Sequence, residues 1–343
     1  MRSNRYGDQR QTIYAANDTV LQIVSPTKRF FQIVDPLVGI ATNFCMILPD
    51  ARTIRTQTPF VFENASSNFV GIYNADRTTF HRLPPRATLT CTLKTQATAS
   101  GVWGSMVHDP AVGNPAFGLS VFNDCTGALL TGVQYSDHGL QSAYGVTGSL
   151  NILSQSEGGK QGTYYLGTGI NAAGYCNSYS ALSNSYLGNG CRACEMKQSL
   201  YNLSTAAEEF ISRFGISDNI TGGAPANGVY LLYDRAAYGD VWVMRNINGA
   251  GNNTVPTAVA PKTGSTGSDW QKLRVEVDSA ASRSDFWIDN VLMSPAGGLN
   301  TRVPLAATAI KHLNICLTKT VGITARYWQM DNYRIQSYPI TPR

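Results

Sequence analysis

Short runs of apolar or alternating residues, each closed by Asn, Asp, Gly or Pro, follow one another along this chain from Phe30 onward. The N-terminal part contains FFQIVD, FCMILPD, PFVFEN, NFVGIYNA, HRLPPRATLTCTL and GVW. Strand-sized runs with turn signals every ~8–12 residues are typical of a β-sandwich or barrel. Each run is too short to bury an apolar face alone, so the chain must stack its strands into two layers.

The later runs repeat every two residues. In the stretch 270–278, Leu273, Val275 and Val277 point to one side and the charged residues between them to the other. This pattern predicts an antiparallel strand with one buried face and one solvated face. The stretch FWIDNVL carries Asp289-Asn290, a good two-residue hairpin turn.

The composition supports a β fold. Only 14% of the residues are charged, against an ordinary ~25%, while 43% are hydrophobic, which excludes a disordered chain. The formal charge of +5 is concentrated in residues 1–110, where eleven Lys and Arg face seven Asp and Glu. No basic tract typical of nucleic-acid binding is present, and no apolar stretch approaches the ~18 residues of a membrane span. The start MRSNRYGDQRQTIY lacks the apolar region of a secretory signal, so we expect no export signal.

The pattern divides the chain into four segments. We predict an N-terminal arm in 1–29, a small β domain in 30–105, a Gly- and Pro-rich linker in 106–120 and a larger β domain in 121–343. One helix is predicted in LSTAAEEFISRF, because Thr205 and Glu208 have capping-box spacing and Phe210 and Phe214 can share a helical face.

Two resemblances follow from these residues. The stretch with Leu48-Pro49-Asp50-Ala51, Asn64-Ala65-Ser66-Ser67 and Gly101-Val102-Trp103 resembles a small β domain of tailed-phage structural and fibre proteins, although Pro84-Pro85 stands where Gly is more typical. The segments YNLSTAAEEFISRFGISD, GVYLLYD, DVWVMRN, WQKLRVEVD, FWIDNVLM and YWQMDNYRI are similar to concanavalin-like, laminin-G-like jelly rolls of phage particles. The fold class they imply is all-β: a small N-terminal β-sandwich or barrel, then a larger concanavalin-like jelly-roll sandwich with one short helix.

No catalytic or metal-binding set emerges. Glycanases on this scaffold place paired acids on one strand as Glu-x-Asp-x-x-Glu, and Glu276-Val277-Asp278 matches only in part. A calcium site from Asp285, Asp289 and Asp331 lacks a compact acidic loop, so turn-forming Asp is the preferred interpretation. The cysteines Cys176, Cys191 and Cys194 lack a fourth zinc ligand; a local disulfide is an alternative, and buried thiols are the main expectation. We therefore predict no enzyme, no cofactor and no metal.

Tyrosines in a Gly-, Asn- and Ser-rich span are the strongest functional signal, since such surfaces suit recognition. We predict that they contact either a neighbouring subunit or a glycan: Tyr164, Tyr165, Tyr175, Tyr179 and Tyr186. Attachment to the particle is predicted through the basic N-terminal residues Arg2, Arg5 and Arg10, with ordinary surface charge as the alternative interpretation.

The first functional hypothesis is a non-enzymatic structural protein of a tailed-phage virion, either a head decoration or fibre or a short tail appendage. Its expected partners are the major capsid protein or tail and portal proteins, and its own copies, in a homotrimer. The protein would then be located in the virion, assembled in the host cytoplasm. The alternatives are a lectin-like tail-fibre adhesin for host surface glycan and, less favoured, a glycanase or lyase.

Overall fold

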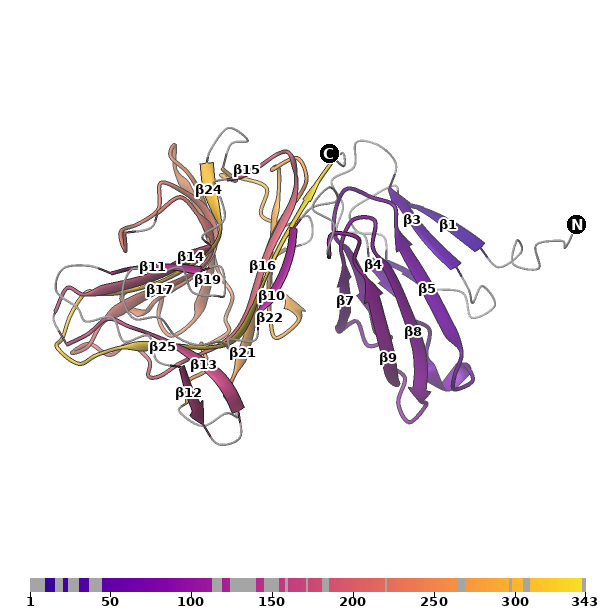
Figure 1. Ribbon diagram of the computed structural model, residues 1–343, viewed down its shortest axis with the longest axis horizontal. Helices are drawn as coiled ribbons and strands as arrows, with labels where there is room; N and C mark the ends of the chain where they lie inside the picture. Colours follow the sequence, from indigo (N-terminus) through magenta and orange to yellow (C-terminus); the bar gives the residue numbers. More distant parts are fainter. Residues whose placement is uncertain are drawn as a thin grey trace, which may run out of the picture. The chain divides into compact units, whose positions relative to one another are not determined.

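The computed structural model describes residues 10–15, 21–23, 31–36, 45–112, 119–123, 140–144, 154–157, 160–170, 172–180, 185–219, 221–264, 269–295, 298–304 and 309–340. The chain forms two compact units. Unit 1 comprises Met1–Leu119 and Tyr338–Arg343, and unit 2 comprises Ser120–Ser337. The described secondary structure is almost all β, which confirms the predicted class (Figure 1).

The described residues of unit 1 form nine strands in two sheets. Their bounds are β1 Arg10–Ala15, β2 Leu21–Ile23, β3 Phe31–Pro36, β4 Cys45–Ile47, β5 Pro59–Asn64, β6 Val70–Tyr73, β7 Thr79–Leu83, β8 Thr88–Thr95 and β9 Val102–His108. One sheet has the order β1-β3-β5-β8-β9 and the other β2-β4-β6-β7. Strands β1 to β6 alternate between the two sheets, so their pairs within each sheet are parallel. Strands β1 and β2 lie in the segment predicted as an arm, and β9 runs three residues into the predicted linker.

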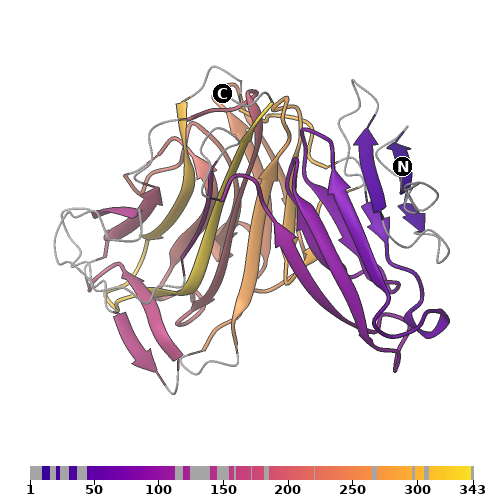
Figure 2. The ribbon, with the colours of Figure 1, turned by 45° about the vertical axis from the view of Figure 1, so that its right-hand side comes forward.

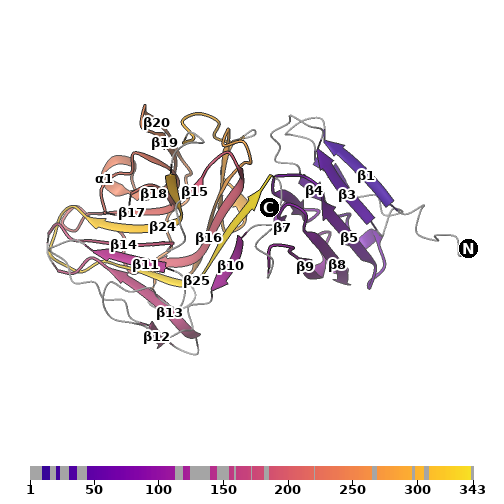
Figure 3. The same cartoon turned by 45° about the horizontal axis from the view of Figure 1, so that its top comes forward.

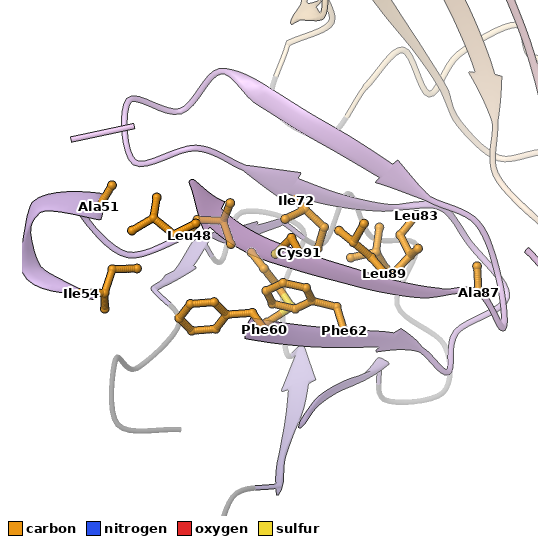
Figure 4. Close-up of a cluster of buried hydrophobic side chains, with 13 residues drawn as sticks. Leu48, Ala51, Ile54, Phe60, Phe62, Ile72, Leu83, Ala87, Leu89 and Cys91 are labelled. Atoms are coloured by element: carbon orange, nitrogen blue, oxygen red, sulfur yellow. The ribbon is translucent and has the colours of Figure 1, made fainter. Parts of the chain in front are cut away.

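The core of unit 1 lies between these sheets. Phe60 and Phe62 of β5 and Leu89 and Cys91 of β8 are fully buried, because every second residue of both strands faces inward. Figure 4 shows these side chains converging with Ile72 of the other sheet. The two-residue alternation of apolar residues in β5 and β8 thus matches their alternating burial in this core.

The end of the chain completes unit 1. The Tyr338 ring packs edge-on against Phe69, with 5.6 Å between centroids, and its hydroxyl donates a 2.6 Å hydrogen bond to Asp109 Oδ2. Arg86 Nη1 donates to the Pro339 carbonyl at 3.2 Å. Residues more than 200 positions apart in sequence thus contribute to one small sandwich.

Unit 2 is a sandwich of two sheets. Its described strands are β10 Leu119–Asn123, β11 Leu140–Tyr144, β12 Ser154–Glu157, β13 Lys160–Gly167, β14 Tyr175–Ser180, β15 Ser185–Tyr186, β16 Gly190–Leu200, β17 Phe210–Ser217, β18 Asn227–Asp234, β19 Trp242–Asn248, β20 Asn252–Pro256, β21 Gln271–Val277, β22 Ser284–Ile288, β23 Val291–Leu292, β24 Ala309–Lys319 and β25 Tyr327–Pro339. The sheet that we call sheet A has the order β11-β14-β24-β17-β18-β19-β20, with β15 beside β24. Sheet B has the order β12-β13-β25-β16-β21-β22-β23, with β10 beside β25.

The C-terminal strands lie inside these sheets rather than at their edges. Figure 2 shows the yellow strands β24 and β25 lying among magenta and orange strands from the middle of the chain. Strand β24 lies between β14 and β17, so sheet A is complete only when the chain end has been added. The turn between β22 and β23 is formed by Asp289 and Asn290, both with positive φ, which confirms the predicted hairpin.

An aromatic chain fills the centre of unit 2. Phe210 packs on Tyr233, Tyr233 on Trp242, and Trp242 on Trp328 of sheet B. All four side chains are at most 2% exposed. The two indole nitrogens donate to Gln271 Oε1 and Gln198 Oε1, which satisfies their polar groups inside the core.

The helix predicted in LSTAAEEFISRF is wrong. Phe210–Ser217 form strand β17, which lies between β24 and β18. Residues four apart share a face in a strand as well as in a helix, so Phe210 and Phe214 fit both. The Glu208 carboxylate accepts hydrogen bonds from Thr324 and Ile323 instead of capping a helix.

A short helix lies elsewhere. The described α-helix is α1, Arg235–Tyr238, beside β18 (Figure 3). Asp234 caps it by accepting from the Ala237 amide at 3.2 Å. Within the described residues no helix has the length and apolar character needed to cross a bilayer.

Candidate functional site

The outer face of sheet A carries an unusual concentration of polar and aromatic side chains. Phe210 and Phe214 face the core, so Ile211, Arg213 and Gly215, at the alternate positions of the strand, face outward. Residues that pair with these three on the neighbouring strands also face outward, and together they form rows that cross the strands. We call the whole set the outer face of sheet A.

Two rows define this face. The first runs through Tyr179, Asn314, Gly215, Tyr230 and Arg245. The second runs through Asn177, Cys316, Arg213, Leu232 and Val243. The first row crosses four strand spacings, roughly 19 Å at ~4.8 Å each. Most side chains of the two rows are buried: Asn177 and Val243 are 0%, Tyr230 is 2% and Asn314 is 4% exposed, so only the half-buried residues at the ends of the rows reach the surface.

The β14 end of the face is built from aromatic and amide groups. Tyr175 and Tyr179 are half-buried on the same side of the strand, and Lys311 Nζ lies 5.6 Å from the Tyr179 ring centroid. Asn177 lies between the two tyrosines and is 0% exposed. Its Oδ1 accepts no hydrogen bond from any described residue. A buried amide oxygen without a donor is costly unless water or a ligand supplies one.

The loop after β17 covers part of this end. The Gly222 carbonyl accepts from Arg213 Nη1 at 3.2 Å and from Thr318 Oγ1 at 2.6 Å. The Asn219 carbonyl accepts from the Asn177 and Asn314 side-chain amides. A Cβ on Gly222, whose φ is +76°, would lie 2.4 Å from Tyr175 Cγ. Glycine is therefore required where the loop meets the tyrosine.

The β19 end of the face is cationic. Tyr230 is 2% exposed, and Arg245 and Arg213 act on its hydroxyl electrostatically. Burial raises the pKa of Tyr230 and outweighs the two guanidinium charges, which lower it, so the hydroxyl keeps its proton at neutral pH. Among the described residues neither arginine forms an ion pair. The Tyr230 ring itself belongs to an apolar cluster with Leu232 and Val243, and Tyr238 packs against that cluster.

The structure separates the five predicted tyrosines. It places Tyr175 and Tyr179 together on the outer face of sheet A. Tyr164 and Tyr165 are consecutive residues of β13 in sheet B, and Tyr165 is 7% exposed. Tyr186 is 51% exposed on β15. The subunit or glycan contact predicted for them stays a prediction.

The predicted basic attachment residues are not tested. Arg2 and Arg5 lie outside the described residues. Arg10 begins β1, where the backbone alone is described. Their role in attachment stays a prediction.

Sequence reasoning missed Asn177, Arg213, Tyr230, Arg245 and Asn314. Each is a polar or amphipathic residue at an alternate position of a recognisable strand, so alternation alone could have placed it on an outer face. The signal that groups them is the strand order, which joins β14 to β24 and β24 to β17. The order of the strands in sheet A cannot be inferred from local sequence pattern.

The carboxylates considered for catalysis are held by basic partners. The outer side of β21 was predicted to be solvated, and this is wrong: Arg274 is 5% and Glu276 4% exposed. Arg274 Nε lies 2.6 Å from Glu276 Oε1, and its Nη1 lies 3.1 Å from Glu195 Oε2. Pairing lets these charges be buried, whereas single charges would have to face water. Asp278 accepts from Ser282 and Arg283 and closes a turn.

The three Asp residues considered as calcium ligands each form an ion pair with a different basic residue. Asp285 pairs with Arg283, Asp289 with Lys262 and Asp331 with Lys197. In the described part of the chain no three His, Cys, Asp or Glu side chains gather as a metal site would require.

Five cysteines whose side chains the structure describes are buried free thiols, as expected for Cys176, Cys191 and Cys194. They are Cys91, Cys176, Cys191, Cys194 and Cys316. Burial raises the pKa of Cys91 to about 12, and it raises the pKa of the other four thiols as well. Such thiols are poor nucleophiles at neutral pH.

The class that these elements define is a two-unit β protein whose larger unit is a two-sheet sandwich with a polar outer face. No protein-family model matches the chain, and no curated protein matches it. Among solved structures, a protein of unknown function from Shewanella oneidensis MR-1 aligns over 66% of this chain and 89% of its own, with 10% identity and a TM-score of 0.47.

Two further structures share this general similarity. Peanut lectin covers 65% of this chain and 99% of its own length at 15% identity, with a TM-score of 0.42. A carbohydrate esterase from Shiga toxin-encoding bacteriophage phi24B covers 59% and 91% at 14% identity, with a TM-score of 0.37. Likeness at this level concerns the β-sandwich architecture only.

Proposed function

We propose that this chain is a carbohydrate-binding protein of a tailed-phage particle, and that unit 2 holds glycan on the outer face of sheet A without cleaving it. The observation that carries the proposal is the grouping of Tyr175 and Tyr179 with the buried, unpaired Asn177 Oδ1. Aromatic faces offer apolar surface to a sugar ring, and an amide oxygen accepts from a sugar hydroxyl. The adjoining Asn314 and Lys311 add further polar groups to the same face.

Binding without cleavage agrees with the state of the acids. Glycoside hydrolysis needs one carboxylic acid and one free carboxylate on either side of the scissile bond. The rows of the outer face described above contain no carboxylate. Glu195 and Glu276, on sheet B, are held by Arg274.

The test is retention of labelled protein on an array of bacterial capsular polysaccharides and lipopolysaccharides. A Tyr179→Ala variant is expected to weaken binding to the retained glycan by about tenfold or more, because it removes a central aromatic contact. Tyr179→Phe should keep most of the affinity, since the ring remains. Affinities are measured by biolayer interferometry.

The matched control is Tyr201→Ala, which removes a 43% exposed tyrosine that packs edge-on against Tyr327 of sheet B. It should bind like the wild type. Retention of no glycan, or equal losses in both alanine variants, would refute the proposed face. A shortened polysaccharide after incubation would show cleavage instead. Antibody labelling of purified particles checks the assignment to the virion.

A second candidate function, contact between copies, is favoured by strand β9 of unit 1. It is an edge strand of its sheet, and Val102 and Met106 are 58% and 69% exposed. The strand VWGSMVH contains no Lys, Arg, Asp, Glu or Pro, the residues that protect edges from pairing. We propose that a second copy of this chain pairs along β9 within the homo-oligomer, for which a trimer is the expected state.

Met106→Glu is expected to shift the protein to smaller species in sedimentation-velocity ultracentrifugation, because a charge would be buried in the contact. Val291→Glu, at a 52% exposed position of unit 2, is the control. An unchanged oligomeric state, or a wild type that is monomeric at high concentration, would contradict contact through β9.

A further inference from the structure

We infer that three loops at one end of unit 2 form a contact surface for a second copy of this chain. The loops are 168–174, between β13 and β14, 205–209, before β17, and 320–326, between β24 and β25. We call their exposed surface the loop patch. It belongs to unit 2, so it is separate from the contact along β9 of unit 1, and it lies outside the rows of the outer face of sheet A.

Hydrogen bonds hold the three loops together. The Thr320 and Val321 amides donate to the Glu209 carbonyl at 2.9 and 3.2 Å. The Thr168 amide donates to the Arg326 carbonyl at 3.0 Å. Loop 320–326 is therefore tied to both of the other loops. A surface that is ordered before binding loses less conformational entropy when a partner covers it.

The exposed side chains of the loop patch are apolar or small. Ile323 and Ile170 are 72% and 70% exposed, the highest values among large apolar side chains of the described chain, and Val321 is 40% exposed. The other exposed positions that the structure describes in these loops are Ala or Thr. Soluble monomers rarely leave contiguous apolar surface in water, and the centres of protein interfaces are poor in charge. The loop patch therefore has the composition of a contact surface.

The charged residues of the three loops are withdrawn from this surface. The Glu208 carboxylate accepts from the Ile323 amide at 3.2 Å and from the Thr324 hydroxyl at 2.7 Å. Arg326 is 8% exposed, and its Nη2 lies 3.8 Å from Glu208 Oε2. Glu209 is half-buried. Among the described residues of these loops, no exposed one carries a charge.

The absence of exposed charge favours a second copy as the occupant. In a symmetric contact the same patch of two copies meets, so an exposed charge would lie near an identical charge. Like charges opposed across an interface weaken binding, and the loop patch presents none. An anionic lipid surface would instead be attracted by exposed Lys or Arg. The loop patch is thus complementary to itself in charge as well as in apolar character.

The first experiment places a single cysteine on the loop patch of the full-length protein. Val321→Cys is expected to form a covalent dimer with bismaleimidoethane on denaturing gels, because a symmetric contact brings position 321 of two copies together. The wild type gives the background from the native cysteines, of which the five described are buried. Val291→Cys, at a 52% exposed position of β23, is the matched control and should give only background.

The second experiment introduces a charge into the contact. Ile323→Glu is expected to lower the association constant measured by sedimentation velocity by about tenfold or more, because the carboxylate would be buried between copies. Added to Val321→Cys, it should reduce the cross-linked fraction as well. Ile323→Leu keeps the apolar surface and should associate like the wild type. Far-UV circular dichroism confirms that each variant is folded.

The outcomes separate the loop patch from the other two surfaces. Cross-linking at position 321 should persist at a lower yield in Met106→Glu, and its complete loss there would refute a contact made by the loop patch itself. Background cross-linking of Val321→Cys, or normal association of Ile323→Glu, would also overturn the inference and leave glycan binding and the β9 contact standing. Flotation with phosphatidylcholine vesicles that Ile323→Glu abolishes, without cross-linking, would assign the loop patch to lipid and refute the second copy.

Discussion

An Arg274→Met variant is expected to lose about 3–5 kcal/mol of unfolding free energy, because the change leaves buried carboxylates without their counter-ion. Arg274 contacts Glu276 at 2.6 Å, Glu195 at 3.1 Å and Gln336 at 3.2 Å. Glu276 is 4% exposed, so water cannot replace the guanidinium. Urea unfolding followed by far-UV circular dichroism measures the loss.

The matched double variant Arg274→Met/Glu276→Leu should recover much of this stability. It replaces the pair by apolar groups and leaves no isolated charge at position 276, and such replacements are often neutral or stabilising. A single variant within about 1 kcal/mol of the wild type, or a double variant worse than the single one, would contradict this account of the pair.

The pH dependence follows from Glu195. Burial raises its pKa, but the charges of Arg274, Lys272 and Arg334 outweigh burial and hold the pKa below the ordinary value. A carboxyl whose pKa is lowered by folding contributes stability above its unfolded-state pKa, and that stability is lost as pH falls through the folded-state pKa. The difference between wild type and Arg274→Met should therefore be largest near neutral pH and shrink below the ordinary glutamate range. A difference that grows in acid would have the wrong sign.

Trp242→Ala is the second change with a large expected effect, a loss of about 3–5 kcal/mol. The indole is 0% exposed, lies between Tyr233 and Trp328, and donates to Gln271 at 2.7 Å. Its removal leaves a cavity at the contact between the two sheets and leaves Gln271 Oε1 with the Lys262 amide, at 3.3 Å, as its remaining donor.

Trp242→Phe keeps an aromatic ring and should cost less than the alanine change. Tyr201→Ala, at an exposed tyrosine, should stay within about 0.5 kcal/mol of the wild type. Because two units can unfold in separate transitions, the effect is assigned to the transition that Trp242→Ala shifts while the other stays in place. Should both tryptophan variants unfold like the wild type, Trp242 would not be the centre of the core.

Local pattern was sufficient for most strands. The alternation in 59–64 and 88–95 identifies the residues that face the unit 1 core, and Asp289-Asn290 identifies a hairpin turn. These features depend on neighbours within a few residues. The alternation also placed Leu273, Val275 and Val277 correctly inside.

Local pattern gave the wrong secondary structure where a helix and a strand place the same residues on one face. Phe210 and Phe214 fit a helix and a strand equally, and only the neighbours β18 and β24 decide for the strand. Charged positions on β21 look solvated until Glu195 of β16 is placed opposite Arg274. In both cases the deciding contact comes from a distant part of the chain.

The amino-acid order alone determined that this protein is built from short strands with apolar inner sides, because alternation and turn chemistry act over a few residues. The tertiary structure alone decided which outward residues become neighbours. Tyr179, Tyr230 and Arg245 share a row only because β24, near the chain end, lies between β14 and β17, and hydrogen-bond register fixes which residues face each other.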